Sequence, residues 1–125
     1  MRYFLDTEFD GFGGALISLA LVGENGRELY LATACSNPTE WVRENVLPIV
    51  VSQGATPTMI EPDQFGAFIS IFLENDSHPI ITSDWPDDIR YFCQSLIIGP
   101  GMMVPLRSVS FDMVRVDAYP TSLDG

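Results

Sequence analysis

The chain has 125 residues, 46% of them hydrophobic, which is enough for one domain to bury a core without a disulfide framework. Six basic residues, all Arg, stand against 17 acidic ones, and the net charge of −11 argues against a tight grip on duplex nucleic acid, because such proteins usually carry a basic footprint. No run reaches the roughly 18 apolar residues of a membrane span, and acids near the start exclude a secretory signal, so we expect a soluble, unprocessed protein.

The two cysteines, Cys35 and Cys93, lie far apart in apolar surroundings and outside any C-x-x-C spacing. Two reduced, buried thiols are therefore a better interpretation than a disulfide or a metal-binding pair. This favours the cytoplasm.

The N-terminal part of the chain predicts three strands in an antiparallel meander. Residues 2–8 begin with aromatic and apolar side chains typical of a buried strand and end in acids. After the flexible sequence DGFGG at 10–14, apolar runs at 16–22 and 28–33 are joined by Gly-Glu-Asn-Gly, which indicates a hairpin.

Two helices are predicted next. Asn37 and Pro38 form an N-cap and a first helical position, and apolar residues at helical spacing extend this helix to about residue 47. Residues 51–60 have no periodicity and predict a loop. Residues 65–73 repeat aromatic and aliphatic side chains along one helical face, which we expect to lie in the core.

The remaining chain predicts a strand at 80–83, a helix at 86–96 and, after a Gly-Pro-Gly break, an edge strand or extended connection at 106–113. An antiparallel meander followed by helices and a strand–helix unit predicts an α/β fold with a mixed, ribonuclease-H-like sheet.

Asp6 and Glu8 are two positions apart on the first strand, so their side chains face the same way. Carboxylates suit Mg²⁺ or Mn²⁺, and two such ions roughly 4 Å apart can activate a water and stabilise the leaving oxygen of a phosphodiester. Bound cations would also let a phosphate approach an acidic chain. The alternative is that these acids mark only the exposed end of a strand.

A second acidic cluster, SDWPDD at 83–88, lies where an apolar strand turns into a helix. We predict Asp88 as a further metal ligand entering from this side. The alternative is ordinary capping, with Asp84 as the N-cap and Asp87 and Asp88 at the positive end of the helix dipole.

Other residues near these motifs are candidates for binding a substrate. Phe9 and Trp85 flank the acids and are predicted to stack on a nucleobase, although packing within the protein is an equal alternative for both. Thr7, between Asp6 and Glu8, is grouped with them as substrate-binding. His78 precedes a proline in polar sequence, which predicts a surface turn rather than a general base.

Asp6-Thr-Glu-Phe9 resembles the first motif of the DEDD superfamily of 3′-to-5′ exonucleases, and Asp88-Ile-Arg-Tyr-Phe resembles the second. The segment 2–92 is more closely similar to the small bacterial 3′-to-5′ exoribonucleases of the mycobacterial type. That resemblance implies a ribonuclease-H-like fold, two Mg²⁺ or Mn²⁺ ions held by Asp6, Glu8 and Asp88, removal of nucleotides from a single-stranded or overhanging RNA 3′ end, and a homodimer.

The third motif of that superfamily, a His followed five positions later by an Asp, has no match in the chain, and Tyr119 with Asp124 imitates its spacing only around an intervening proline. We therefore expect residues 1–125 to be one exonuclease-like domain that is incomplete at its C-terminus. A degenerate relative, or a variant with a base from elsewhere, is the alternative explanation. The competing function is a catalytically inactive nuclease-like module for binding or regulation, and the sequence alone does not distinguish RNA from DNA.

Overall fold

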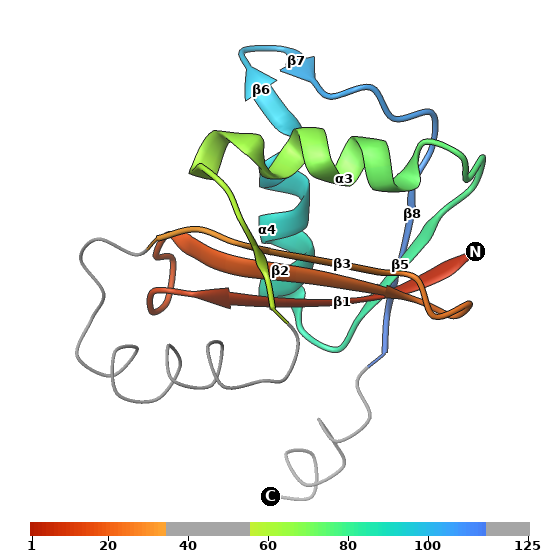
Figure 1. Ribbon diagram of the computed structural model, residues 1–125, viewed down its shortest axis with the longest axis horizontal. Coiled ribbons are helices and arrows are strands. Elements are labelled where there is room, and N and C mark those ends of the chain that lie inside the picture. The colour runs from red at the N-terminus through yellow and green to blue at the C-terminus, as the bar shows by residue number, and fades with distance from the viewer. Residues whose placement is uncertain (35–55, 115–125) are drawn as a thin grey trace, which may run out of the picture.

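The computed structural model describes residues 1–34 and 56–114 (Figure 1). The strands of its main sheet are β1 (Arg2–Phe9), β2 (Leu16–Gly23), β3 (Glu28–Ala32), β4 (Thr58–Met59), β5 (Ile80–Ser83) and β8 (Ser110–Met113). The other elements are the short 3₁₀ helix η1 (Pro62–Gln64), the helices α3 (Phe65–Leu73) and α4 (Pro86–Leu96), and a hairpin of β6 (Ile97–Gly99) and β7 (Met102–Met103).

The six-stranded sheet has the order β4-β3-β2-β1-β5-β8. β1, β2 and β3 form an antiparallel meander, as predicted, whereas β5 runs parallel to both β1 and β8. This mixed sheet with its two helices is compatible with the predicted ribonuclease-H-like α/β fold. β1 is thus an interior strand with partners on both sides.

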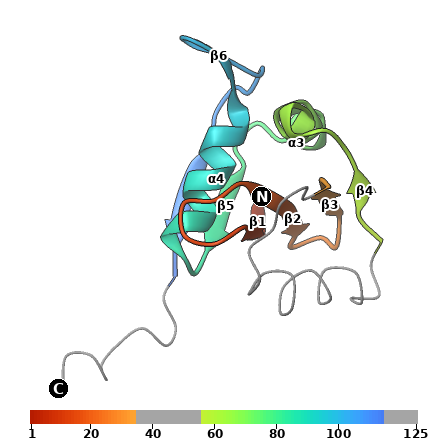
Figure 2. The same ribbon diagram turned by 90° about the vertical axis from the view of Figure 1, so that its left-hand side faces the viewer.

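Both helices cover one face of the sheet (Figure 2). The predicted apolar stripe of α3 lies in the core, where Phe65, Ile69 and Leu73 pack with Phe92 of α4. α3 also approaches α4 closely at Gly66, because a Cβ there would collide with the carbonyl oxygen of Ser95. Glycine is therefore required at this crossing.

The alternation of β1 separates its side chains onto the two faces of the sheet. Tyr3, Leu5 and Thr7 are buried toward the helices. Phe4, Asp6 and Glu8 alternate with them and lie on the opposite face, where Phe4 is 52% exposed. The strand therefore carries core residues on one side and candidate ligands on the other.

The structure contains short strands that the sequence did not predict and one strand that is shorter than predicted. A two-residue strand, β4, pairs parallel to β3 within the segment predicted as a loop. The Gly-Pro-Gly break is the turn of the β6–β7 hairpin, in which Gly101 has a φ of 68°. The edge strand β8 is shorter than the predicted segment. The helix expected at 38–47, Cys35, Tyr119 and Asp124 lie outside the described residues.

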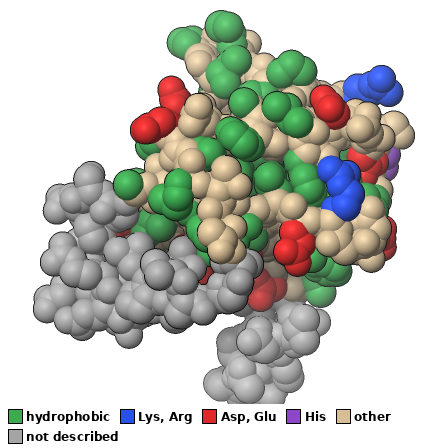
Figure 3. All heavy atoms as spheres, viewed as in Figure 1, with side chains coloured by type: hydrophobic (Ala, Val, Ile, Leu, Met, Phe, Trp, Pro, Cys, Tyr) green, Lys and Arg blue, Asp and Glu red, His purple; other side chains and the backbone are tan. Residues whose placement is uncertain are grey.

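The β6–β7 hairpin projects from the body of the molecule beside α3 (Figure 1). Apolar side chains are visible over this part of the surface (Figure 3), and those more than half exposed include Ile71, Ile97, Ile98 and Met102. Cys93 is a free thiol that is only partly buried. Within residues 1–34 and 56–114, none of the helices has the length and apolar character needed to cross a membrane.

Candidate active site

Asp6 and Glu8 lie in the C-terminal half of β1, on the sheet face opposite the helices. The strand register places Asp6 across from Ala20 and Glu8 across from Ser18, and Tyr30 of β3 is the next residue along the row that contains Asp6 and Ala20. The two carboxylates thus share one face, as the D-x-E spacing predicts.

Asp88 reaches the same region from α4. It occupies the first turn of that helix and is only 4% exposed. The Thr7 hydroxyl donates a hydrogen bond to Asp88 Oδ1 at 2.6 Å, and the Ser83 hydroxyl donates one to Asp88 Oδ2 at 2.8 Å. The first and second acidic motifs are therefore joined directly, through the residue between Asp6 and Glu8.

The prediction of Asp84 as an N-cap was wrong. Trp85 occupies the N-cap position and makes no side-chain capping bond, while the Trp85 backbone amide donates to Ser83 Oγ at 3.2 Å. Pro86 at the first helical position needs no amide partner, so the helix starts without a carboxylate cap. Asp84 is an exposed residue just before the helix.

The carboxylates repel one another. Partial desolvation, followed by the charges of Asp88 and Asp84, raises the pKa of Asp6, although its side chain lies on the exposed face. Burial and then the charges of Asp6 and Asp88 raise the pKa of Glu8. Burial and the charge of Asp84 raise the pKa of Asp88, and together they outweigh the hydrogen bonds from Thr7 and Ser83, which lower it.

The charges of Asp6 and Glu8 also affect Tyr30. Burial, then Glu8 and Asp6, raise the pKa of its phenol. All the charges that contribute to these shifts, within the described part of the chain, are negative. A cation bound here would relieve this repulsion.

The donor atoms fit a hard divalent cation, because all are carboxylate oxygens. No three or more His, Cys, Asp or Glu side chains are gathered as a complete metal site in the described residues. Mg²⁺ does not need such a cage, since it usually keeps several waters and takes one or two carboxylates together with substrate phosphates. Asp6 and Glu8 meet that smaller requirement.

Phe9 and Trp85, the predicted stacking residues, have different surroundings. The Phe9 ring stacks on Tyr91 of α4, with centroids 4.6 Å apart and planes at 25°. The Tyr91 hydroxyl donates to the Gly14 carbonyl oxygen and so ties this ring to the turn after β1. Trp85 is 48% exposed, and its indole Nε1 donates to Asp87 at 3.4 Å.

A pocket of about 450 Å³ lies beyond Phe9, at the end of the sheet. Asp10, Thr33, Tyr91, Gln94 and Ser95 are among its lining residues, whereas Asp6, Glu8 and Asp88 are not. It is therefore next to the acidic residues rather than formed by them. Tyr91, which sequence reasoning did not select, links this pocket to Phe9; its position one helical turn after Asp88 was the only indication of that role.

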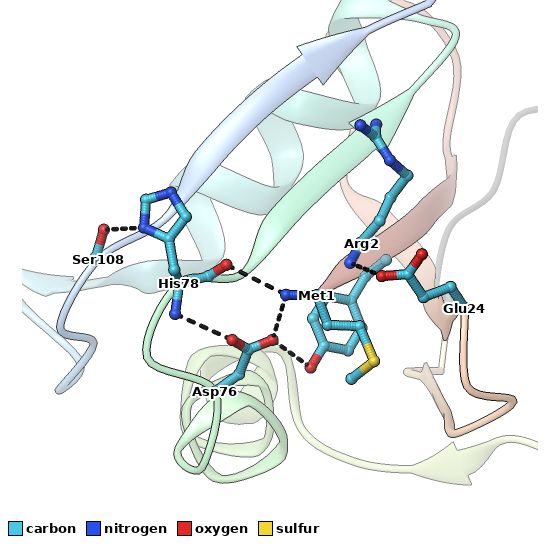
Figure 4. Close-up of polar contacts among 7 residues, drawn as sticks. Met1, Arg2, Glu24, Asp76, His78 and Ser108 are labelled. Atoms are coloured by element: carbon cyan, nitrogen blue, oxygen red, sulfur yellow. Dashed lines mark hydrogen bonds and ion pairs between the residues drawn. The ribbon is translucent and has the colours of Figure 1, made fainter.

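His78 lies at the other end of β1, as Figure 4 shows. It is exposed in a turn, as predicted, and its Nδ1 is 3.5 Å from the Ser108 hydroxyl. Because β1 and β5 run parallel from this end, His78 is separated from Glu8 by nearly the length of β1, roughly 20 Å. It cannot act as a base beside Asp6 and Glu8 in this arrangement.

Comparison with known proteins finds a partial match. No protein-family model matches the chain. Two proteins from two strains of Mycobacterium tuberculosis, each described as a 3′-5′ exoribonuclease, are 49% identical to it over 53 residues. The match covers 38% of this chain and 32% of each relative, so it spans about a third of the curated relatives' length. Part of the chain is thus similar to a 3′-5′ exoribonuclease.

Proposed function

We propose that the chain is a 3′-to-5′ exoribonuclease domain of the DEDD type, which hydrolyses phosphodiester bonds from the 3′ end of single-stranded RNA with the help of Mg²⁺ or Mn²⁺. The observation that carries this proposal is the placement of Asp6 and Glu8 on one face of β1, with Asp88 held against the same strand by Thr7. The partial similarity to the mycobacterial exoribonucleases supports the choice of RNA.

The three carboxylates would hold the cations, with Asp6 and Glu8 as direct ligands and Asp88 as the third acid. Two bound ions would supply a water of lowered pKa and stabilise charge on the phosphate. The protein itself concentrates negative charge at the end of β1, which repels a phosphate until cations are present. The net charge of −11 makes the dependence on cations stronger.

The 3′-terminal nucleotides would lie across the C-terminal end of β1. Trp85, which is 48% exposed, would supply a ring for a nucleobase to stack on. Phe9 contributes less directly, because Tyr91 already covers one face of its ring. Thr7 is buried and donates to Asp88, so we assign it to the site's framework before any contact with substrate.

A second candidate function is a nuclease-like module that binds RNA or a protein without cleaving. The position of His78 favours it, because the chain's one histidine is far from the acids and supplies no general base. A homodimer and a cytoplasmic location stay predictions under either function.

Digestion of RNA tests the proposal. A single-stranded RNA labelled at its 5′ end, incubated with the chain and Mn²⁺, should give a ladder of products shortened from the 3′ end, while a circular RNA of the same sequence should stay intact. The Asp6→Ala, Glu8→Ala double variant should produce no ladder. Mn²⁺ binding without any shortening would favour the non-cleaving module, and loss of the circular RNA would indicate an endonuclease instead. A DNA of the same sequence measures the preference for RNA.

A further inference from the structure

We propose that Thr7 and Ser83 are positioning residues that hold the Asp88 carboxylate in a fixed orientation toward the divalent-cation site, an inference that rests on the proposed function. Each oxygen of Asp88 accepts one short hydrogen bond, at 2.6 Å from Thr7 and at 2.8 Å from Ser83. A carboxylate restrained at both oxygens cannot rotate about its terminal bond without breaking one of them.

Thr7 is suited to this role by its place in the strand. The same alternation that directs Asp6 and Glu8 to the open face directs Thr7 into the interior, where α4 begins. The middle residue of D-T-E therefore binds the acid of the second motif, while its neighbours lie on the opposite face of the strand.

Ser83 fixes the other oxygen from the end of β5. Its hydroxyl has one proton, and Asp88 Oδ2 at 2.8 Å is both nearer and more strongly accepting than the Trp85 carbonyl oxygen at 3.3 Å. Its oxygen accepts the Trp85 backbone amide at 3.2 Å, which sets the direction of that proton. Ser83 thus connects the strand end, the helix start and the carboxylate.

The two hydrogen bonds do not occupy all the acceptor sites of the Asp88 carboxylate. An ionised carboxylate has about four lone-pair sites, so each oxygen retains one for a cation or for a water bound to a cation. Hydrogen-bond partners of this kind around metal-binding carboxylates typically change metal affinity by roughly 10- to 100-fold when removed. That range is the effect we expect for Thr7 and Ser83.

The test measures Mn²⁺ affinity by calorimetry on the 125-residue chain. Thr7→Val and Ser83→Ala remove the hydroxyls, whereas Thr7→Ser retains one. Thr82→Val is the matched control, because Thr82 is, like Ser83, a buried hydroxyl residue of β5, but its hydroxyl accepts from Arg2 Nη1 at 2.6 Å near the N-terminal end of β1. Thermal unfolding of every variant checks that it is folded.

Thr7→Val and Ser83→Ala should each weaken Mn²⁺ binding by about 10-fold or more. Thr82→Val should leave Mn²⁺ affinity within about twofold of the unmodified chain, despite a similar loss of stability. Thr7→Ser, which keeps a hydroxyl, should retain most of the affinity. In an Asp88→Ala background, Thr7→Val should have almost no further effect, because Thr7 acts through Asp88. Unchanged Mn²⁺ affinity in folded Thr7→Val and Ser83→Ala, or equal losses in these variants and Thr82→Val, overturns the positioning role and leaves the proposed function standing. Absence of both Mn²⁺ binding and RNA shortening in the unmodified chain overturns both.

Discussion

The two ends of β1 have opposite effects on the carboxylates beside them: the pKa is lowered at one end and raised at the other. At the N-terminal end, Asp76 accepts the Tyr3 hydroxyl at 2.9 Å and the His78 backbone amide at 3.0 Å, and pairs with the Met1 amine at 3.1 Å (Figure 4). Burial alone would raise the pKa of Asp76, but these donors outweigh it and the net pKa is lowered. This carboxylate is therefore stabilised as an anion by the fold.

At the C-terminal end, Asp6 and Glu8 experience partial desolvation and further negative charge, and both pKa values are raised. The fold thus destabilises these anions at one end of a strand while it stabilises another at the other end. Structural needs do not explain the second arrangement, since a neutral side chain would cost less there. The cation of the proposed function would relieve this repulsion.

Removing a carboxylate from the acidic end should have the largest effect. Asp6→Ala is expected to lower Mn²⁺ affinity by more than about 100-fold, because losing a direct ligand should exceed the loss of a surrounding hydrogen-bond partner. Calorimetry gives the affinity. Asp112→Ala is the matched control. The Asp112 carboxylate pairs with Arg2 at 2.7 Å and is not one of the proposed ligands, so its removal should leave Mn²⁺ binding unchanged. Equal losses in both variants would mean that Mn²⁺ responds only to net charge.

At the N-terminal end of β1, where Asp76 is paired, removing the carboxylate should lower the stability of the fold rather than Mn²⁺ affinity. Asp76→Ala leaves the Tyr3 hydroxyl without its acceptor, and Tyr3 is fully buried as a residue, so we expect a loss of about 1–3 kcal/mol in the free energy of unfolding. Urea denaturation measures this loss, and Mn²⁺ affinity should not change. Asp76→Asn, which keeps an acceptor oxygen, should lose less; if the two variants are equally stable, the hydrogen bonds contribute nothing.

Tyr3 allows the paired end to be followed by pH. Burial, followed by the hydrogen bond and the charge of Asp76, raises the pKa of Tyr3 from 10.0 to about 12. A raised folded-state pKa contributes stability that is complete below pH 10 and is lost as the pH rises through about 12. Tyrosinate absorbance should show one phenol ionising near pH 12, absent from Tyr3→Phe and shifted downward in Asp76→Asn. A Tyr3 that titrates at its ordinary pKa would contradict the burial of its hydroxyl.

Sequence patterns predicted the elements whose information is local. Aromatic and apolar side chains at its start identified β1, and helical spacing identified α3 and α4, because each of these patterns is contained within one element. The two-residue β4 could not be predicted in this way, because only its pairing with β3 makes it a strand.

In the candidate site too, the sequence predicted what depends on one element and missed the contacts between distant segments. The D-x-E spacing indicated that Asp6 and Glu8 share a face, whereas Thr7 between them was grouped with the substrate-binding residues and is buried in the structure. The Thr7–Asp88 hydrogen bond spans 81 positions and depends on where α4 begins against β1, as does the Phe9–Tyr91 stack. Asp84 looked like a cap because its residue type suits one, but the chain begins the helix one residue later.

The smallest expected effect is the change in stability caused by Asp6→Asn, and its sign should reverse when Mn²⁺ is added. In a metal-free buffer at neutral pH, Asp6→Asn should raise the free energy of unfolding by only about 0.3 kcal/mol, because Asp6 is exposed and solvent screens its repulsion. The sign follows from its raised pKa: the penalty exists when Asp6 is ionised and disappears at acid pH, where both forms are neutral. With saturating Mn²⁺ the order should invert, since a ligand that binds only the folded state stabilises the unmodified chain by mass action. Unfolding curves with and without Mn²⁺ measure both differences. If Asp6→Asn is less stable than the unmodified chain without metal, Asp6 has a structural partner, and the contrast between the two ends of β1 is lost.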